Sequence, residues 1–395
     1  MIHKSPPLGA VLDQLGETAD RPFDDATSLP PSIYWREDVA DLERERIFRR
    51  DWVCAGLAAD LQAPGDYLTF SVADEPVFCI RDREGKIRTF SNVCRHRMMR
   101  LVEGAGRASR ITCPYHAWTY DLNGRLVGAG QMKRSRSFDK ASICLPEIRT
   151  EIWQGWIYIT LNPHARSTSD LLAPLESVVD RYRMADYVPI ARQDHVWQTN
   201  WKLLTENFME GYHLPVAHKK TVGAWFPAKQ TWFPDETFEA FTYQTFAKAE
   251  VARYGRAHAE NTSLEGYWRH TSVMPTVFPC HMYVLAPDHL WYLSLRPKGV
   301  GEVNVRFGAA LAPEVYADLN DPEAWLAEVA QFFDMVNDED RFLVEGIFQG
   351  ARSGFAAPGP LSWLEREIHE FERYLARRMA SAMIGHPPML SEAAD

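Results

Sequence analysis

Two short segments that each pair a cysteine with a histidine constrain this chain more than any other feature. Residues 94–96 read C-R-H and residues 113–116 read C-P-Y-H, with sixteen residues between His96 and Cys113. Two thiolates and two imidazoles on tight loops suit a zinc ion or an iron–sulfur cluster. Packing alone does not explain four such residues at this spacing. The pattern therefore indicates a metal site, with structural zinc as the rival to a cluster.

The segments around these pairs predict a small all-β domain. From residue 64 onward the apolar residues alternate with a period of two, and turn signals interrupt them at Pro64-Gly65, Glu84-Gly85 and Asn123-Gly124. Residues 36–52 read as a helix, and residues 1–35, which are rich in Pro and Asp, read as an extended arm. We expect an arm over residues 1–39 and a β domain over residues 40–165.

Residues 166–395 predict a second domain of the α+β class. A helical segment over residues 167–187 is followed by a strand that leads into a further helix, and residues 270–312 are strand-like. A long helix begins after Asp321-Pro322, and an amphipathic helix spans residues 361–383. A chain of 395 residues is long enough for two domains.

A second pair of histidines lies in "ENFMEGYHLPVAH", residues 206–218. Alone, His213 and His218 are a weak signal, because such pairs are common at surfaces and in satisfied cores. A helix running to Pro215 would place Glu206, Glu210 and His213 on one face, with Asn207 beside them. Pro215 would end that helix, so that His218 turns back toward His213.

A two-histidine iron site needs one carboxylate as a third ligand. The long helix offers Asp340, which projects into the middle of the apolar stripe of that helix. Asp338 projects to the opposite, polar face and is the weaker candidate. A carboxylate facing the interior needs a strong partner, either a metal or a buried arginine. The two histidine motifs favour the metal.

Charge and composition restrict the partners and the compartment. The net charge is −10 and there is no basic run, which argues against nucleic acid and anionic membranes as partners. No signal peptide and no apolar run of ~20 residues is seen, so we expect no membrane span. Six cysteines in this length are too few for a disulfide framework, and a reducing cytoplasm fits.

"CRH" followed by "CPYHAW" resembles the two ligand loops of a Rieske [2Fe–2S] domain. The resemblance implies that Cys94 and Cys113 bind one iron of the cluster and His96 and His116 the other. It also implies that Tyr115 and Trp118 shield the cluster. Two residues depart from the pattern: Met98 and Ala117 stand where glycine is common in this family.

The motifs N-W-K, E-N-x-x-E-x-Y-H-x4-H and a late E-D resemble the catalytic domain of the Rieske non-heme iron oxygenases, α subunit, and the likeness covers nearly the whole chain. It implies an N-terminal Rieske domain followed by a helix-grip-like α+β domain with an antiparallel sheet. His213, His218 and Asp340 would bind mononuclear Fe(II). Glu210 would join His213 to His116 of a neighbouring subunit in a head-to-tail homotrimer. Asn207 would lie near the iron, and Tyr212 would support the site.

The resemblance implies an O2-dependent monooxygenase or dioxygenase that receives electrons from a separate NAD(P)H-dependent reductase or ferredoxin, since this chain has no flavin or nucleotide motif. The glutamate at position 210 resembles the acid at the corresponding position of the choline, glycine betaine, carnitine and stachydrine oxygenases. Hydroxylation or oxidative N-demethylation of a small quaternary ammonium or amino-acid-like compound is thus expected. Hydroxylation or O-demethylation of an aromatic acid is the alternative. Six aromatic residues are candidates for a cation cage: Trp225, Phe226, Trp232, Phe233, Trp268 and Trp291.

Overall fold

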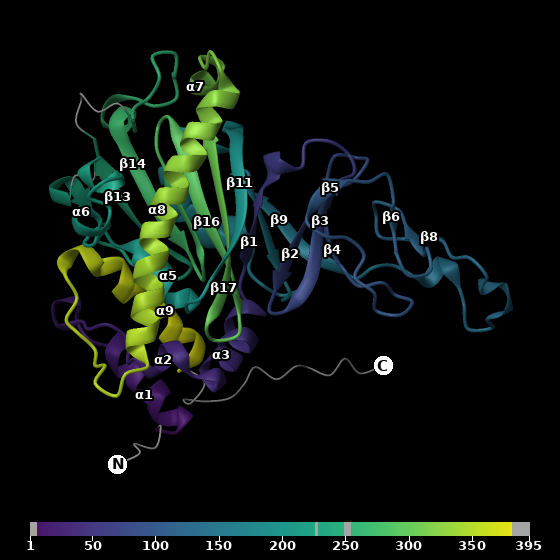
Figure 1. Ribbon diagram of the computed structural model, residues 1–395, viewed down its shortest axis with the longest axis horizontal. Helices are drawn as coiled ribbons and strands as arrows, with labels where there is room; N and C mark the ends of the chain where they lie inside the picture. Colours follow the sequence, from purple (N-terminus) through teal and green to yellow (C-terminus); the bar gives the residue numbers. More distant parts are fainter. Residues whose placement is uncertain (1–5, 226–227, 249–253, 381–395) are drawn as a thin grey trace.

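The computed structural model describes residues 6–225, 228–248 and 254–380. Along its longest axis, helices and one large sheet lie at one end and a set of shorter strands at the other (Figure 1). Within the described residues there are two seven-stranded sheets and one three-stranded sheet, and all strand pairs are antiparallel. The predicted combination of a β domain with an α+β domain is confirmed.

The N-terminal sheet contains the strands that the period-two pattern predicted. Its order is β1 (Val53–Leu57), β10 (Trp156–Thr160), β9 (Glu147–Trp153), β4 (Ile87–Ser91), β3 (Glu75–Arg81), β2 (Asp66–Val72) and β5 (Ala105–Arg107). Strand β2 alternates buried and half-buried residues, as a strand with one face on a core does. The small sheet of β6 (Ile111–Thr112), β7 (Thr119–Tyr120) and β8 (Leu126–Gly128) lies toward the end of the molecule away from the helices (Figure 1).

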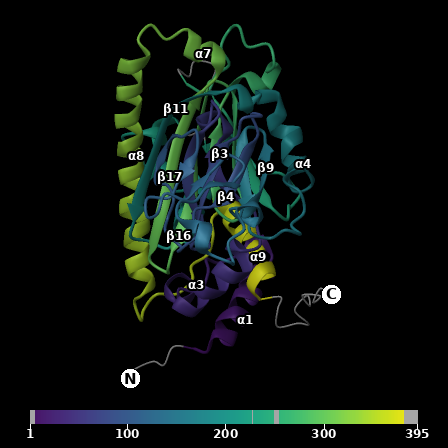
Figure 2. The same cartoon turned by 90° about the vertical axis from the view of Figure 1, so that its right-hand side faces the viewer.

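The second large sheet has the order β11 (Val188–Trp197), β17 (Glu302–Leu311), β16 (His289–Lys298), β15 (His281–Leu285), β14 (Thr271–Val277), β13 (Phe241–Ala247) and β12 (Thr231–Trp232). Every residue of β14 and β15 is buried, because both faces of this sheet are covered. Helices α5 (Trp201–Met209), α8 (Pro322–Ala351) and α9 (Arg366–Met379) pack on one face (Figure 1). The other face meets the N-terminal sheet and α4 (Thr168–Val179), as the layers in Figure 2 show.

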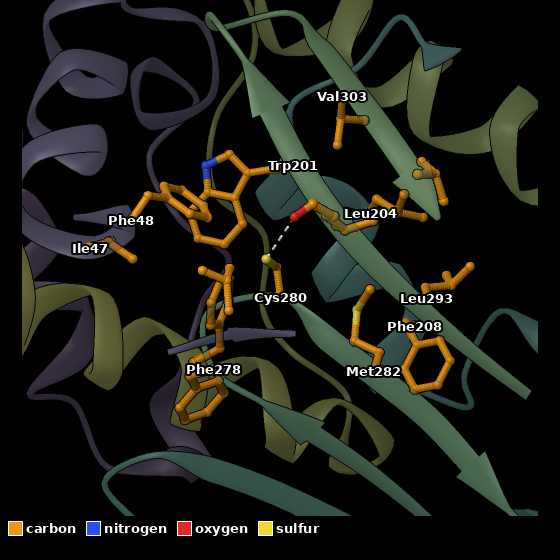
Figure 3. Packing of buried hydrophobic residues seen from close by; sticks show 14 of the residues in the cluster. Ile47, Phe48, Trp201, Leu204, Phe208, Phe278, Cys280, Met282, Leu293 and Val303 are labelled. Carbon is orange, nitrogen blue, oxygen red and sulfur yellow. Dashed lines mark hydrogen bonds between the residues drawn. The ribbon is translucent and has the colours of Figure 1, made fainter. Parts of the chain in front are cut away.

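Helix α5 lies in the main core and is held there by large apolar side chains. Trp201 packs edge-on against Phe48 with 5.0 Å between ring centroids, and Met282 and Leu293 come from the sheet (Figure 3). Two short helices of the second domain are α6 (Leu214–Ala217) and α7 (Pro313–Ala317). Because α5 lies in this core, the segment that follows α5 starts from a fixed position.

The expectation of an extended N-terminal arm is wrong. Residues Leu8–Ala19 form helix α1, followed by α2 (Ser32–Trp35), α3 (Glu37–Glu43) and a π-helical turn (Arg44–Phe48). Val11, Leu12 and Leu15 repeat at helical spacing and are buried, and α1 packs against α9. The Pro and Asp residues that suggested an arm lie mainly in the connections between these helices.

Arg306 of β17 connects the two large sheets. Its guanidinium donates to the carbonyls of Ala55 (2.8 Å) and Thr69 (3.2 Å) of the N-terminal sheet, and it pairs with Asp194 of β11. A charge-assisted contact of this kind fixes the relative orientation of the sheets. The proposed domain boundaries after residues 39 and 165 stay predictions. No helix in the described part of the chain is long and apolar enough to cross a membrane.

Candidate metal centres

The two Cys/His loops have the same backbone hydrogen bonds. The Cys94 carbonyl accepts from the amide of Met98 (3.1 Å), and the Cys94 amide donates to the Met99 carbonyl (2.9 Å). In the second loop, the Cys113 carbonyl accepts from Ala117 (3.0 Å), and the Cys113 amide donates to Trp118 (2.7 Å). Each cysteine therefore starts an equivalent tight turn, and the histidine of each loop lies within that turn.

The four side chains are divided between the interior and the surface. Cys94 and Cys113 are each only 2% exposed, while the rings of His96 and His116 lie nearer the surface with 4.7 Å between their centroids. Trp118 is buried and stacks on His96 at 4.7 Å. A buried thiol pair behind an outer imidazole pair fits a [2Fe–2S] cluster with Cys on one iron and His on the other. Tyr115 contacts His116 but is half exposed, so it covers one edge only.

Tyr120 contacts the ligand Cys94, which the sequence did not reveal. Its hydroxyl lies 3.4 Å from the Cys94 Sγ atom and accepts a hydrogen bond from the amide of Arg95 (3.0 Å). Because the amide is the donor to this hydroxyl, the hydroxyl hydrogen is available to the sulfur. Hydrogen bonds to the ligand sulfurs are among the contacts that set the potential of a cluster.

Met98 and Ala117 have left-handed backbone conformations, with φ values of 56° and 57°. These are the two positions where the resemblance led us to expect glycine. The left-handed region disfavours residues that carry a Cβ atom, by about 1 kcal/mol or more per residue.

We predict that Ala117→Gly stabilises the cluster loop. The midpoint of thermal cluster loss, followed by visible absorbance, is expected to rise by about 2–4 °C. Ala141→Gly is the matched control, because Ala141 lies in a 3-10 helix of the same domain, where glycine only adds flexibility. An equal rise in both variants would contradict the prediction.

The histidine pair after α5 is positioned differently from the helix that the sequence suggested. Helix α5 ends at Met209, and Glu210 is extended, with φ −121° and ψ 150°. The expected placement of Glu206, Glu210 and His213 on one helical face is therefore wrong. His213 precedes the short helix α6, Pro215 lies in the first turn of that helix, and His218 follows its end. The two rings lie 5.1 Å apart between centroids.

His213, His218 and Asp340 converge on one point. The Asp340 Oδ1 atom lies 3.0 Å from His218 Nε2 and 3.6 Å from His213 Nε2. One ligand atom from each residue lies within 4.8 Å of the others, the only such group of three metal-binding residues among the described residues. Asp340 faces inward from α8, as its place in the apolar stripe predicted, whereas Asp338 is exposed and pairs with Arg341. Two imidazoles and one carboxylate fit Fe(II) with open positions.

The charges of this group suit a bound cation. Burial works against protonation of His213, but its contacts with Asp340 and Glu210 outweigh burial and raise its pKa to about 9. Burial would raise the pKa of Asp340, yet the two histidines lower it. The two carboxylates thus favour a positive charge on His213. Metal binding displaces such protons, so the group fits the metal that the motif implies.

Glu210 is closely tied to His213. One carboxylate oxygen contacts His213 Nδ1, and the other accepts from the amides of Tyr212 and His213, the latter at 3.0 Å. Asn207 lies at the edge of the group, with its Nδ2 atom 3.5 Å from His213 Nε2. Tyr212 is 61% exposed, and its backbone amide donates to the Glu210 carboxylate. The expected link from Glu210 to a neighbouring subunit stays a prediction.

Glu339, which sequence reasoning missed, holds His218 from behind. Its Oε2 atom lies 2.7 Å from His218 Nδ1 and accepts a hydrogen bond from the Thr221 hydroxyl (2.6 Å). A carboxylate behind a metal-binding histidine fixes the tautomer and the orientation of the ring. The only signal for Glu339 in the sequence was its place directly before Asp340. Of these two acids, only Asp340 was predicted as a site residue.

We predict that Glu339→Ala weakens iron binding by about 10–100-fold. Iron content after dialysis against graded chelator would measure the change, with the visible spectrum reporting the cluster separately. Asp338→Ala removes the neighbouring exposed carboxylate and is expected to leave iron retention unchanged. Equal iron retention by Glu339→Ala and wild type would show that the ring of His218 needs no such support.

The candidate cage stays a prediction, and the structure places its members in different surroundings. Trp291 packs against Phe208 (5.3 Å between centroids) and Phe307 (6.5 Å), and Phe307 packs against Phe333 of α8 (5.0 Å). Three of the other candidates have partners elsewhere: Trp232 with Tyr243, Phe233 with Trp363, and Trp268 with Arg181 and Tyr182. The side chains of Trp225 and Phe226 lie outside the described residues. The sequence alone could not distinguish aromatic residues of a binding site from aromatic residues of the core.

Comparison with known proteins identifies the family. Residues 184–381 match the ring hydroxylating alpha subunit (catalytic domain), and residues 51–140 match the Rieske [2Fe–2S] domain. The chain belongs to this family of Rieske oxygenase α subunits, O2-dependent oxidoreductases that carry a Rieske [2Fe–2S] cluster and a mononuclear iron. The resemblance drawn from the motifs is thus confirmed.

Two related oxygenase subunits and one solved structure illustrate the similarity. The glycine betaine monooxygenase oxygenase subunit of Pseudomonas aeruginosa (strain UCBPP-PA14) is 29% identical, over 87% of each chain. The carnitine monooxygenase oxygenase subunit of Escherichia coli (strain K12) is 27% identical, over 85% of this chain and 87% of that one. A quaternary ammonium Rieske monooxygenase whose structure addresses carnitine oxidation and inter-subunit electron transfer has a TM-score of 0.79 at 25% identity. That alignment covers 96% of this chain and 100% of the other.

Proposed function

We propose that this chain is the terminal oxygenase of a multicomponent system that hydroxylates or oxidatively N-demethylates a small quaternary ammonium compound. The observation that carries the proposal is the convergence of His213, His218 and Asp340 in a Rieske oxygenase chain whose relatives are named for glycine betaine and carnitine. Glutamate at position 210, which the motif comparison associated with that subgroup, supports it.

In this proposal Cys94, His96, Cys113 and His116 hold the cluster, and His213, His218 and Asp340 hold the iron. When bound, the two groups supply the electrons and the redox chemistry that O2 reduction requires. Glu339 orients His218, and Glu210 orients His213 through its Nδ1 atom. Asn207 lies at the edge of the group of iron ligands, with its Nδ2 atom 3.5 Å from His213 Nε2.

We further propose that the chain acts as a head-to-tail homotrimer. The Cys/His loops lie at one end of the long axis, while α6, next to His213, lies toward the other (Figure 1). A large apolar side chain is exposed at each end: Met98 (80%) in the first Cys/His loop, and Val216 (82%) on α6. Large exposed apolar residues around two distant sites are expected at an interface. A heterologous contact that closes as a ring would cover both and bring the two centres together.

An aromatic cluster of Phe208, Trp291, Phe307 and Phe333 supports the proposed substrate class. These rings come from α5, β16, β17 and α8, and Phe208 directly follows Asn207. Phe333 lies two helical turns before Asp340 on α8. Aromatic rings can attract a quaternary ammonium group through their π faces. Electrons would come from a separate NAD(P)H-dependent reductase or ferredoxin.

The test is substrate-dependent O2 consumption by the holoenzyme with a reductase. The panel contains glycine betaine, carnitine, choline and stachydrine, with benzoate and vanillate as aromatic acids. We expect turnover with at least one quaternary ammonium compound, and formaldehyde release for a demethylation. A response to the aromatic acids alone would replace the proposed substrate class with the alternative one. Trp291→Leu, which removes one π face, is expected to raise KM more than it lowers kcat.

A further inference from the structure

A buried glutamine of the second sheet contacts the last carbonyl group of α5, one residue before Glu210. Gln244 lies in the middle of β13 and is fully buried. Its Nε2 atom is 2.7 Å from the carbonyl oxygen of Met209, the last residue of α5. The same nitrogen is 2.6 Å from a carboxyl oxygen of Glu367 on α9, which is also buried. Gln244 therefore joins the end of α5 to α9.

These two contacts fix the orientation of the Gln244 amide group. An amide nitrogen carries two hydrogens, and the Met209 carbonyl and the Glu367 carboxyl group accept one each. With the amide reversed, its oxygen would face the Met209 carbonyl, and neither of those atoms can donate. The nitrogen of Gln244 is thus the atom that faces α5.

The other atom of the amide group shows that packing alone does not favour a glutamine here. The Gln244 Oε1 atom is buried and has no hydrogen-bond partner among the described residues. An unpaired buried polar atom lowers stability. A leucine of similar volume would avoid that cost. The two hydrogen bonds from the nitrogen are therefore what a glutamine contributes at this position.

Two backbone groups at the end of α5 have partners that differ from those of a continued helix. In a continued helix the Met209 carbonyl would accept from the amide of His213, four residues later. Here the Met209 carbonyl accepts from Gln244, and the His213 amide donates to the Glu210 carboxylate (3.0 Å). Gln244 occupies the acceptor, and Glu210 occupies the donor, of the hydrogen bond that would extend α5.

We infer that Gln244 is a positioning residue for the oxygenase reaction. By holding the last carbonyl of α5, it ends the helix at Met209 and so sets the contact between Glu210 and His213. The inference rests on the proposed function, in which Glu210 orients His213 through its Nδ1 atom. A longer helix would use the His213 amide for its own hydrogen bond, and the Glu210 carboxylate would lose that donor. The hydrogen bonds of Gln244 reach none of the proposed iron ligands, so it acts through the backbone of α5.

The first test is a crystal structure of the holoenzyme with Gln244→Leu, which has a similar volume but neither donor. We expect the Met209 carbonyl to accept from a later backbone amide. The Glu210 carboxylate should then lie beyond hydrogen-bond distance, about 3.5 Å, from His213 Nδ1. Glu367→Gln is the conservative variant, because its amide oxygen still accepts from Gln244, and it should retain the Glu210 contact. An unchanged Glu210 contact in Gln244→Leu overturns the inference.

The second test is a double-mutant cycle of turnover with Gln244→Leu and Glu210→Gln. Alone, Gln244→Leu is expected to lower kcat by on the order of 10-fold, as a displaced group at an active site does. If Gln244 acts through Glu210, the double variant turns over no more slowly than Glu210→Gln alone. A merely structural role would not produce this coupling. Losses that multiply in the double variant would therefore overturn the inference.

Gln154→Leu is the matched control for the substitution itself. The Nε2 atom of Gln154 also contacts two acids, Glu176 (3.0 Å) and Asp180 (3.2 Å), beside α4. This variant is expected to keep wild-type turnover. The cluster signal and the iron content show whether each variant is folded and loaded.

A second variant replaces Gln244→Leu if that protein does not load with metal. Glu367→Leu keeps the glutamine but removes the carboxyl group that holds it. We expect its turnover to fall below that of Glu367→Gln, with the Glu210 contact lengthened in its structure. Equal turnover of Glu367→Leu and Glu367→Gln would overturn the inference in that case.

Failure of the proposed function looks different, because then wild type turns over no quaternary ammonium compound. The cycle is in that case measured on the substrate-free reoxidation of the reduced cluster by O2. The crystal structures need no substrate. An unchanged Glu210 contact in Gln244→Leu overturns the inference whatever the substrate is.

Discussion

Asp340→Asn is expected to abolish turnover while leaving the Rieske cluster intact. Asp340 supplies the one carboxylate of the group, and its Oδ1 atom lies 3.0 Å from His218 Nε2. Asparagine keeps the size but loses the charge that balances a divalent cation. We expect iron content to fall to the level of the cluster alone, and turnover to fall by more than about 100-fold, the loss that even an outer contact of a ligand can cause.

Metal analysis and low-temperature EPR of the reduced protein measure both effects at once. The cluster signal reports that the N-terminal domain is folded and loaded, so a loss of iron cannot be blamed on general unfolding. The matched control is Asp338→Asn, two residues earlier on the same helix, where the carboxylate is exposed and pairs with Arg341. If Asp338→Asn lost the iron and Asp340→Asn kept it, the helix projection that selected Asp340 would be refuted.

Asp340 illustrates what the sequence pattern could predict. A single carboxylate in the apolar stripe of a long helix has an unfavourable place unless a partner explains it, and this argument needs no knowledge of tertiary contacts. The Cys/His loops are equally local, because their four residues lie in two tight turns. The alternation of the β domain and the start of α8 after Asp321-Pro322 are further features that short-range rules predict.

The end of α5 shows where such rules fail. The sequence favoured a helix through Glu210 to Pro215, yet the helix ends at Met209. The Glu210 carboxylate accepts from the amides of Tyr212 and His213, which gives the backbone an alternative to helical hydrogen bonds. Nothing in the pattern of apolar residues reports that competition, so the orientation of His213 was not predictable from it.

The buried glutamates of α9 show a second limit of short-range rules. Residues 361–383 read as an amphipathic helix, in which glutamates are expected on the solvent face. Glu367 and Glu372 are instead buried, because α1, α5 and β13 pack against α9. Covering by elements distant in sequence is a tertiary property. Glu339 and Tyr120 were missed for the same reason, since their partners lie far along the chain.

Glu210→Gln is expected to separate the two metal centres functionally without removing either. In the structure both Glu210 oxygens are engaged by the loop that carries His213, and the carboxylate contacts His213 Nδ1. Glutamine is isosteric but neutral, and its amide nitrogen cannot accept a hydrogen bond. We expect both centres to load with metal, because none of the seven proposed ligands changes. Steady-state turnover is expected to fall by on the order of 100-fold, the size of a lost charged contact at an active site.

The decisive measurement is the rate at which a reduced cluster is reoxidised by O2 in the presence of substrate. A cluster that stays reduced in Glu210→Gln, with a normal EPR signal and full iron content, locates the defect between the centres. A cluster that reoxidises at the wild-type rate would show that electrons need no carboxylate at this position.

Mixed trimers then test the head-to-tail arrangement. Subunits with Glu210→Gln are combined with subunits that carry His116→Cys, which disables the cluster of the donor. Activity should return, because some pairs of neighbours contain one intact cluster and one intact Glu210 on different chains. No recovery in the mixture would place both groups of each working pair on the same chain.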